Sequence, residues 1–217
     1  MNFEKLEALL NTFPELGIPG VDCAVYVNHE PVFRHMAGYS DKEAKIPMKG
    51  NETYFIYSCS KPITCAAALT LLEDGKMLLT DPVSEYIPEF SEMFLPNGEK
   101  AKHPITIKHL FTMTAGLDYD LFAPEIQAVT EAKGENASTL DIVRAIAKRP
   151  ISFEPGSRWQ YSLCHDVLAG VAEVISGKQF SDFVQKKIFD PVGMTRSSYH
   201  PCAKNEKDIA ALYHFNV

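Results

Sequence analysis

The chain has 217 residues, of which 46% are hydrophobic and 23% are charged, and its 21 basic and 28 acidic side chains give a net charge of −7. This length suits one domain, and the apolar content excludes a disordered chain. The negative charge, without a basic stripe, argues against nucleic acid as a partner, and the absence of about 18 consecutive apolar residues excludes a membrane-spanning helix.

The first part of the chain predicts a helix followed by a β-hairpin. Apolar side chains recur with helical spacing over residues 3–13, and Pro14 ends this stripe. Two extended runs over residues 22–28 and 31–38 surround a polar break, which predicts an antiparallel pair of strands. We expect residues 38–51 to form a polar loop.

The rest of the chain predicts helices. Residues 60–73 are rich in Ala and Leu and end at a helix-stop signal, and further helices are predicted over residues 106–113, 138–148, 164–176 and 180–189. A two-stranded hairpin is marginal alone, and nothing later in the sequence reads as a strand. The expected fold class is therefore α+β, mostly helical, with an incomplete antiparallel sheet.

A serine and a lysine mark the start of the helix predicted over residues 60–73. Ser58 and Lys61 are three residues apart, which places them on one helix face and lets the Lys61 amine reach the Ser58 hydroxyl. The free N–H groups and the positive dipole end of a helix N-terminus suit a nucleophile and half of an oxyanion hole. Ser and Lys at this spacing also arise by chance, so the pair alone leaves both interpretations open.

A tyrosine supplies a second candidate. Tyr161 follows a Pro-Gly turn, within residues 159–162, and precedes the helix predicted over residues 164–176. From there it could reach the pair of Ser58 and Lys61. The alternative is a core tyrosine whose hydroxyl makes ordinary hydrogen bonds.

No pattern in the sequence indicates a metal, a cofactor or a leader. Five cysteines without a CxxC pair and seven histidines without ligand spacing predict no metal site, and no phosphate-binding glycine loop occurs. A signal peptide needs an uncharged apolar core, whereas Glu4 and Lys5 interrupt the first helix. We therefore expect a cytoplasmic protein without a cofactor, unless a leader has been removed.

Ordered sequence blocks across nearly the whole chain add to these candidates. The blocks are residues 18–20, 55–62, 72–76, 81–90, 105–117, 153–156, 159–162, 175–177 and 190–194. Together they resemble the superfamily of serine β-lactamases, penicillin-binding proteins and related esterases, in its class C-like branch. One block could arise by chance, but the whole set keeps the family's order.

The resemblance implies a β-lactamase/transpeptidase-like fold and roles for individual residues. Ser58 matches the acylated nucleophile, Lys61 the base or proton shuttle, and Tyr161 the second-motif tyrosine that passes protons to and from the leaving group. Ser162 and Leu163 match positions that bind the substrate. Free lysine and tyrosine titrate near ~10, so we expect burial to lower the pKa of Lys61 and the nearby ammonium to lower the pKa of Tyr161.

Two departures from the family pattern modify this expectation. The family's second motif is usually Tyr-x-Asn, but Leu163 stands at the third position and cannot hydrogen-bond a substrate amide through its side chain. This departure shifts the expected substrate from β-lactams or peptides toward esters. The family's third motif, Lys/His-x-Gly, which supplies an oxyanion donor, does not occur after Tyr161.

The missing motif predicts that residues 1–217 form one β-lactamase-like domain that is truncated at its C-terminal end. Residues 1–57 would contribute the helix and hairpin of the sheet, and residues 58–217 a mainly helical part. We expect this chain alone to be an impaired catalyst. Its incomplete sheet would also favour self-association.

Three functions remain open on the sequence alone. The first is a serine hydrolase that forms an acyl-enzyme on Ser58 and takes small esters or amides. The second is a penicillin-binding-like sensor that acylates slowly or not at all, and the third is a truncated, non-catalytic binding protein. Intact Ser58, Lys61 and Tyr161 favour the first, whereas Leu163 and the missing third motif favour the others.

Overall fold

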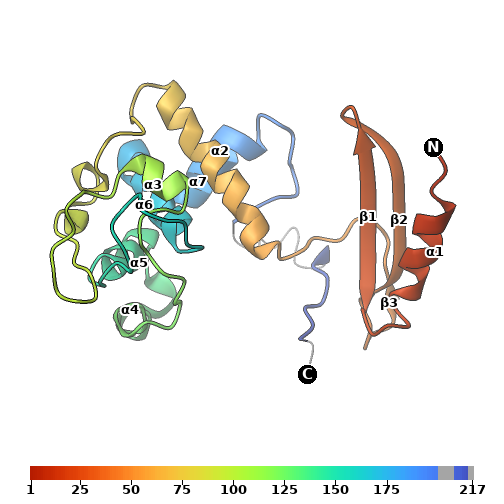
Figure 1. Ribbon diagram of the computed structural model, residues 1–217. Helices are drawn as coiled ribbons and strands as arrows, with labels where there is room; N and C mark the ends of the chain where they lie inside the picture. Colours follow the sequence, from red (N-terminus) through yellow and green to blue (C-terminus); the bar gives the residue numbers. More distant parts are fainter. Residues whose placement is uncertain (200–207, 215–217) are drawn as a thin grey trace. The chain divides into compact units, whose positions relative to one another are not determined.

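The computed structural model describes residues 1–199 and 208–214 of the chain (Figure 1). Helices and a small antiparallel sheet make an α+β fold. The chain divides into two compact units, Met1–Tyr57 with Arg196–Val217, and Ser58–Thr195. The expected division of the domain, with a mainly helical part over residues 58–217, stays a prediction.

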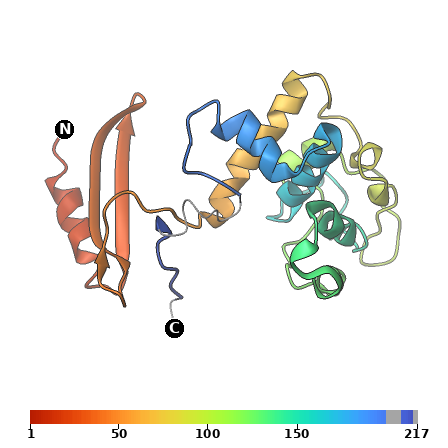
Figure 2. The same ribbon diagram turned by 180° about the vertical axis from the view of Figure 1, so that it is seen from behind.

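The first unit is an antiparallel sheet with one helix packed against it. Its elements are α1 (Glu4–Thr12), β1 (Gly20–Val27), β2 (Glu30–Asp41) and β3 (Ile46–Pro47), with the strands in the order β1-β2-β3. Helix α1 packs against β2, as both views show (Figures 1 and 2). The rings of Phe3 and Phe33 stack there with centroids 4.8 Å apart, and Leu10 is buried.

The sheet extends further along the chain than the sequence pattern indicates. Strand β2 continues past Gly38 to Asp41 and pairs there with β3, in a stretch expected to be a polar loop. Gly38 has a φ of 80°, and a Cβ at this position would lie 2.3 Å from the Pro19 carbonyl oxygen. This close approach leaves room only for glycine at position 38. Because glycine is depleted in strands, the sequence pattern ends the predicted strand at Gly38, before its actual end.

A segment near the C-terminal end pairs with the same unit. The Thr53 N–H donates to the Asp208 carbonyl at 2.7 Å, and the Ala210 N–H donates to the Thr53 carbonyl at 2.9 Å. These bonds form a parallel bridge between Thr53 and Ile209. A pairing between segments so far apart leaves no local sequence signal, which explains why the pattern assigns this segment to the helical part.

The second unit is helical. Its helices are α2 (Ser60–Glu73), α3 (Ile107–Phe111), α4 (Pro124–Lys133), α5 (Thr139–Ile146), α6 (Cys164–Ser176) and α7 (Phe180–Val184). A π-helical turn over Gln185–Phe189 extends α7, and 3₁₀ turns lie at Val83–Glu85, Pro88–Phe90 and Gly134–Asn136. Helix α6 is central, because α2, α3, α5 and α7 all pack against it (Figure 1).

Several helix ends follow the signals in the sequence. The Asp141 N–H donates to Ser138 Oγ at 3.1 Å, and the Ser138 N–H donates to the Asp141 carboxylate at 3.0 Å, which makes the expected capping box of α5. Helix α6 ends at Gly177, whose φ of 65° lies in the left-handed region. The sequence pattern does not predict α4, because Ile126 is the one buried side chain of that helix.

The core of the second unit lies where α2 meets α6. The buried face of α2 combines the small side chains of Ala67 and Ala68 with Leu71, so the two helices can approach closely. On α6 the buried face includes Val167 and Leu168. Full burial of one such side chain contributes about 1.5–3 kcal/mol. Among the described residues, no helix has both the length and the apolar character that a membrane crossing requires.

Candidate active site

Ser58 lies in a tight turn directly before α2. A 3₁₀ turn over Tyr57–Cys59 leads into the helix, and Tyr57 has a φ of 45°, in the left-handed region. A non-glycine residue in that region carries some backbone strain. The sequence pattern places Ser58 at the helix start, whereas the regular helix begins at Ser60, so Ser58 lies just before the positive end of the α2 dipole.

Two side chains from distant parts of the chain converge on Ser58. The Lys61 ammonium donates to Ser58 Oγ at 3.4 Å, and the Tyr161 hydroxyl donates to the same oxygen at 2.6 Å. Tyr161 arrives there because its segment precedes α6, which packs against α2. Both side chains thus reach Ser58, as the sequence analysis expects, whereas the catalytic roles of the three residues stay predictions.

A second tyrosine, which the sequence reasoning does not identify, completes the surroundings of Lys61. The rings of Tyr119 and Tyr161 lie 5.0 Å apart, with an interplanar angle of 54°. Lys61 Nζ lies 5.1 Å from the centroid of the Tyr119 ring and 5.0 Å from that of Tyr161. Both distances suit a cation–π contact. Tyr119 comes two residues after the block 105–117, and that proximity is its one sequence signal.

The surroundings shift the pKa values of Tyr161 and Lys61 in opposite directions. Hydrogen bonds of Tyr161 with Ser58 and with the Lys61 ammonium, together with the Lys61 charge, lower the pKa of Tyr161. Burial acts to lower the pKa of Lys61, but the hydrogen bond with Tyr161 and the neighbouring Tyr119 and Asp166 outweigh it, so this pKa is raised. The expected lowering of the Lys61 pKa is therefore wrong, because three electronegative neighbours stabilise the ammonium.

Two titratable groups on α6 lie beside this cluster. Burial raises the pKa of Asp166, although the Lys61 charge opposes the change. Burial lowers the pKa of His165, whose Nε2 lies 3.3 Å from the Phe111 carbonyl oxygen and 3.4 Å from the Cys65 sulfur. Since Cys65 is one helical turn beyond Lys61 on α2, these contacts connect α2, α3 and α6 next to the site.

The two predicted substrate-binding residues lie in the core. Ser162 and Leu163 are 1% and 2% exposed. The Ser162 hydroxyl donates to the Cys164 sulfur at 3.0 Å, and the Leu163 N–H donates to the Asp118 carbonyl at 2.9 Å. The structure thus brings together Ser58, Lys61 and Tyr161 and buries the side chains of Ser162 and Leu163, and a substrate contact by either stays a prediction.

Within residues 1–199 and 208–214, no group of three or more His, Cys, Asp or Glu side chains could hold a metal ion. Of the five cysteines, Cys202 lies outside the described residues.

The arrangement of Ser58, Lys61 and Tyr161 suits nucleophilic attack by Ser58 with proton transfer through Tyr161 and Lys61.

Comparisons with known proteins place this arrangement in context. A family model described as Beta-lactamase matches residues 4–217. Esterase EstB of Burkholderia gladioli is 34% identical over 178 residues, which cover 79% of this chain and 45% of EstB. The chain spans about half the length of the curated relatives it matches.

Two solved structures are similar over nearly the whole chain. EstCE1, described as a hydrolase with promiscuous acyltransferase activity, has a TM-score of 0.83 and 28% identity, covering 99% of this chain and 57% of EstCE1. An octameric penicillin-binding protein homologue from Pyrococcus abyssi has a TM-score of 0.76 and 28% identity, covering 97% of this chain and 47% of the homologue.

Proposed function

Because the chain belongs to the beta-lactamase family, we propose that it is part of a serine hydrolase that forms an acyl-enzyme on Ser58. One observation carries the proposal: the Tyr161 hydroxyl and the Lys61 ammonium both donate to Ser58 Oγ, at 2.6 and 3.4 Å. A nucleophile, a proton acceptor in contact with it and a cation beside that acceptor are what covalent catalysis by serine requires.

In the proposed acylation step, Tyr161 acts as the base. Its phenolate form accepts the Ser58 hydroxyl proton while Ser58 Oγ bonds to the carbonyl carbon of the substrate. The Lys61 ammonium stabilises the phenolate, in agreement with the lowered pKa of Tyr161 and the raised pKa of Lys61. The bond to the leaving alcohol then breaks, and Tyr161 returns the proton to the departing oxygen.

Deacylation follows the same proton route in reverse order. A water molecule gives its proton to the Tyr161 phenolate and attacks the acyl carbon, and the bond to Ser58 Oγ breaks as that oxygen takes the proton back. Ser58 directly precedes α2, and the positive end of that helix dipole favours negative charge on the carbonyl oxygen. One acid and one alcohol leave per turnover, and the enzyme returns to its starting state.

Esters are the substrate class that we propose. The position that carries an asparagine in the amide-cleaving pattern holds Leu163, which is buried and has no polar side-chain atom to offer an amide. EstB is named an esterase, and EstCE1 is described as a hydrolase. Small amides are the nearest alternative within the same mechanism.

A penicillin-binding-like sensor is the second candidate function. Buried Leu163, which stands where the usual second motif has an asparagine, favours it, because a contact with the substrate is missing there. The similarity to a penicillin-binding protein homologue from Pyrococcus abyssi also agrees with it. Such a protein would acylate on Ser58 and release the product slowly or not at all.

Labelling and turnover by the full-length protein test both candidates. We expect a fluorophosphonate probe to label the protein, Ser58→Ala to abolish the label, and p-nitrophenyl butyrate to be turned over many times. Cys59→Ala is the matched control, because Cys59 is the exposed nucleophile next to Ser58. Labelling that survives Ser58→Ala contradicts the proposal, and labelling without turnover favours the sensor.

A further inference from the structure

Tyr119, which contacts the Lys61 ammonium, sits on a loop that one arginine holds from outside the site. Arg149, just after α5, donates two parallel bonds to the Asp118 carboxylate, at 2.9 and 2.7 Å. Its guanidinium also lies 3.4 Å from the Asp120 carbonyl oxygen and 3.5 Å from the Asp120 carboxylate. Arg149 therefore binds the residues on both sides of Tyr119.

The same loop is attached to the segment that carries Tyr161. The Asp118 carbonyl accepts the Leu163 N–H at 2.9 Å, two residues after Tyr161. Asp118 thus receives Arg149 on its side chain and the Tyr161 segment on its backbone. The two rings that enclose the Lys61 ammonium consequently share one anchor.

The Arg149 contacts differ from an ordinary surface ion pair. The Arg149 side chain is 18% exposed, so solvent screens the pair less than it would at the surface. The planar guanidinium matches a carboxylate with two bonds at once, and a lysine ammonium cannot reproduce that geometry.

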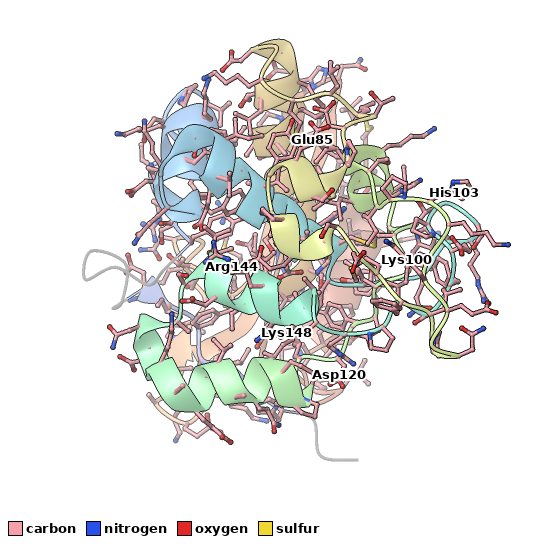
Figure 3. The ribbon with its side chains drawn as sticks, turned by 90° about the vertical axis from the view of Figure 1, so that its left-hand side faces the viewer. Glu85, Lys100, His103, Asp120, Arg144 and Lys148 are labelled. Carbon is pink, nitrogen blue, oxygen red and sulfur yellow. The ribbon has the colours of Figure 1, made fainter. Side chains whose placement is uncertain are left out.

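Figure 3 labels Asp120, which precedes α4, and Arg144, which projects from α5. Arg144 pairs with Glu89 at 3.0 Å and offers a comparison with a second arginine nearby in the chain.

We infer that Arg149 is a positioning residue of the active site: by holding Asp118 and Asp120 it keeps Tyr119 against the Lys61 ammonium and keeps that ammonium directed at Ser58. The inference rests on the proposed acyl-enzyme function. The groups that act on the Lys61 charge are Tyr119, Tyr161 and, from α6, Asp166 and His165. Arg149 acts on this set through the Tyr119 loop and touches none of the reacting atoms.

Arg149→Lys tests this role in the full-length protein, because it keeps the charge and removes the two-bond geometry. A loosened Tyr119 should lower kcat/KM for p-nitrophenyl butyrate about tenfold to a hundredfold, since misplacements of about 1 Å have effects of this size. Tyr119→Leu should cause a similar loss. In the double variant the two losses should not multiply, because Arg149 acts through Tyr119. Arg144→Lys is the control and should leave kcat/KM unchanged.

A second readout does not depend on catalysis. In protein labelled with ¹³C-lysine, the Lys61 side-chain signal, assigned by its loss in Lys61→Arg, should shift its titration in the same direction and by a similar amount in Arg149→Lys and Tyr119→Leu. An unchanged Lys61 titration in Arg149→Lys, or kcat/KM losses that multiply in the double variant, would overturn the inference. If wild-type protein is not acylated at Ser58, the proposed function fails, while the Lys61 titration still decides whether Arg149 positions this site.

Discussion

The Tyr161 hydroxyl lies 2.6 Å from Ser58 Oγ, although 103 positions separate the two residues in the chain. Neither side chain is placed by the other's local structure. The turn before α2 positions Ser58, and the segment before α6 positions Tyr161. The contact between the two side chains therefore depends on the packing of α2 against α6. Removal of this one hydroxyl is therefore a direct test of the proposed proton path.

Tyr161→Phe should lower kcat/KM for p-nitrophenyl butyrate by about 10²–10⁴-fold, because a positioned acid or base typically contributes that much. The ring and its contact with Lys61 remain, so the free energy of unfolding should change little. Tyr26→Phe is the matched control, since Tyr26 is an exposed tyrosine on β1 in the other unit, and its activity should equal the wild type. A Tyr161→Phe variant with wild-type kcat/KM would remove Tyr161 from the mechanism.

The pH dependence of hydrolysis should be bell-shaped on the alkaline side of neutrality. The proposed active form has Tyr161 deprotonated and Lys61 protonated. Because the pKa of Tyr161 is lowered, the rate should rise with pH at values below the ordinary tyrosine pKa of about 10. Because the pKa of Lys61 is raised, the rate should fall only above the ordinary lysine value.

The measurement is kcat/KM for p-nitrophenyl butyrate from about pH 6 to pH 11, corrected for hydrolysis in buffer. The rising and falling limbs of this pH profile reflect the coupled titration of Tyr161 and Lys61, so their midpoints are given as apparent pKa values of the pair. Asp166 and His165 also act on this charge, so Asp166→Asn is measured alongside. A rate that falls continuously from pH 6 upward would be incompatible with Tyr161 as the base.

Sequence reasoning predicts those features that depend on local spacing. Ser58 and Lys61 meet because residues three apart lie about one turn from each other where the 3₁₀ turn continues into α2, and the capping box at Ser138 places the start of α5. The bounds of α6 follow in the same way from an apolar stripe that ends at Gly177. Each of these signals is contained in a few neighbouring residues.

Other features of the site depend on contacts that no local pattern records. Tyr119 matters because its loop is held by Arg149, which follows a different helix. The direction of the Lys61 pKa depends on whether burial or the neighbouring Tyr161 and Asp166 contributes more, and that balance exists only in the folded chain. The burial of Leu163 likewise follows from the packing of α6.

Esters should be better substrates than β-lactams for the full-length protein. The second motif lacks its usual asparagine, and buried Leu163 cannot replace the missing contact with a substrate amide. We expect the rate enhancement over buffer to be larger for p-nitrophenyl acetate or butyrate than for a chromogenic cephalosporin. Both substrates are measured on one protein preparation, with Ser58→Ala as the blank. A larger enhancement on the cephalosporin would show that Leu163 does not set this preference.

The packing of α6 should make stability sensitive to one face of that helix. Leu168 is 0% exposed where α6 packs against its neighbours, so Leu168→Ala leaves a cavity and should lower the free energy of unfolding by about 2–5 kcal/mol. Val174 lies on the same helix but is 41% exposed, and Val174→Ala should cost less than about 1 kcal/mol. Urea unfolding followed by circular dichroism measures both, with the slopes compared to confirm that the same transition is observed. Equal losses in the two variants would mean that α6 is not packed as described, and the approach of Tyr161 to Ser58 would then lose its structural basis.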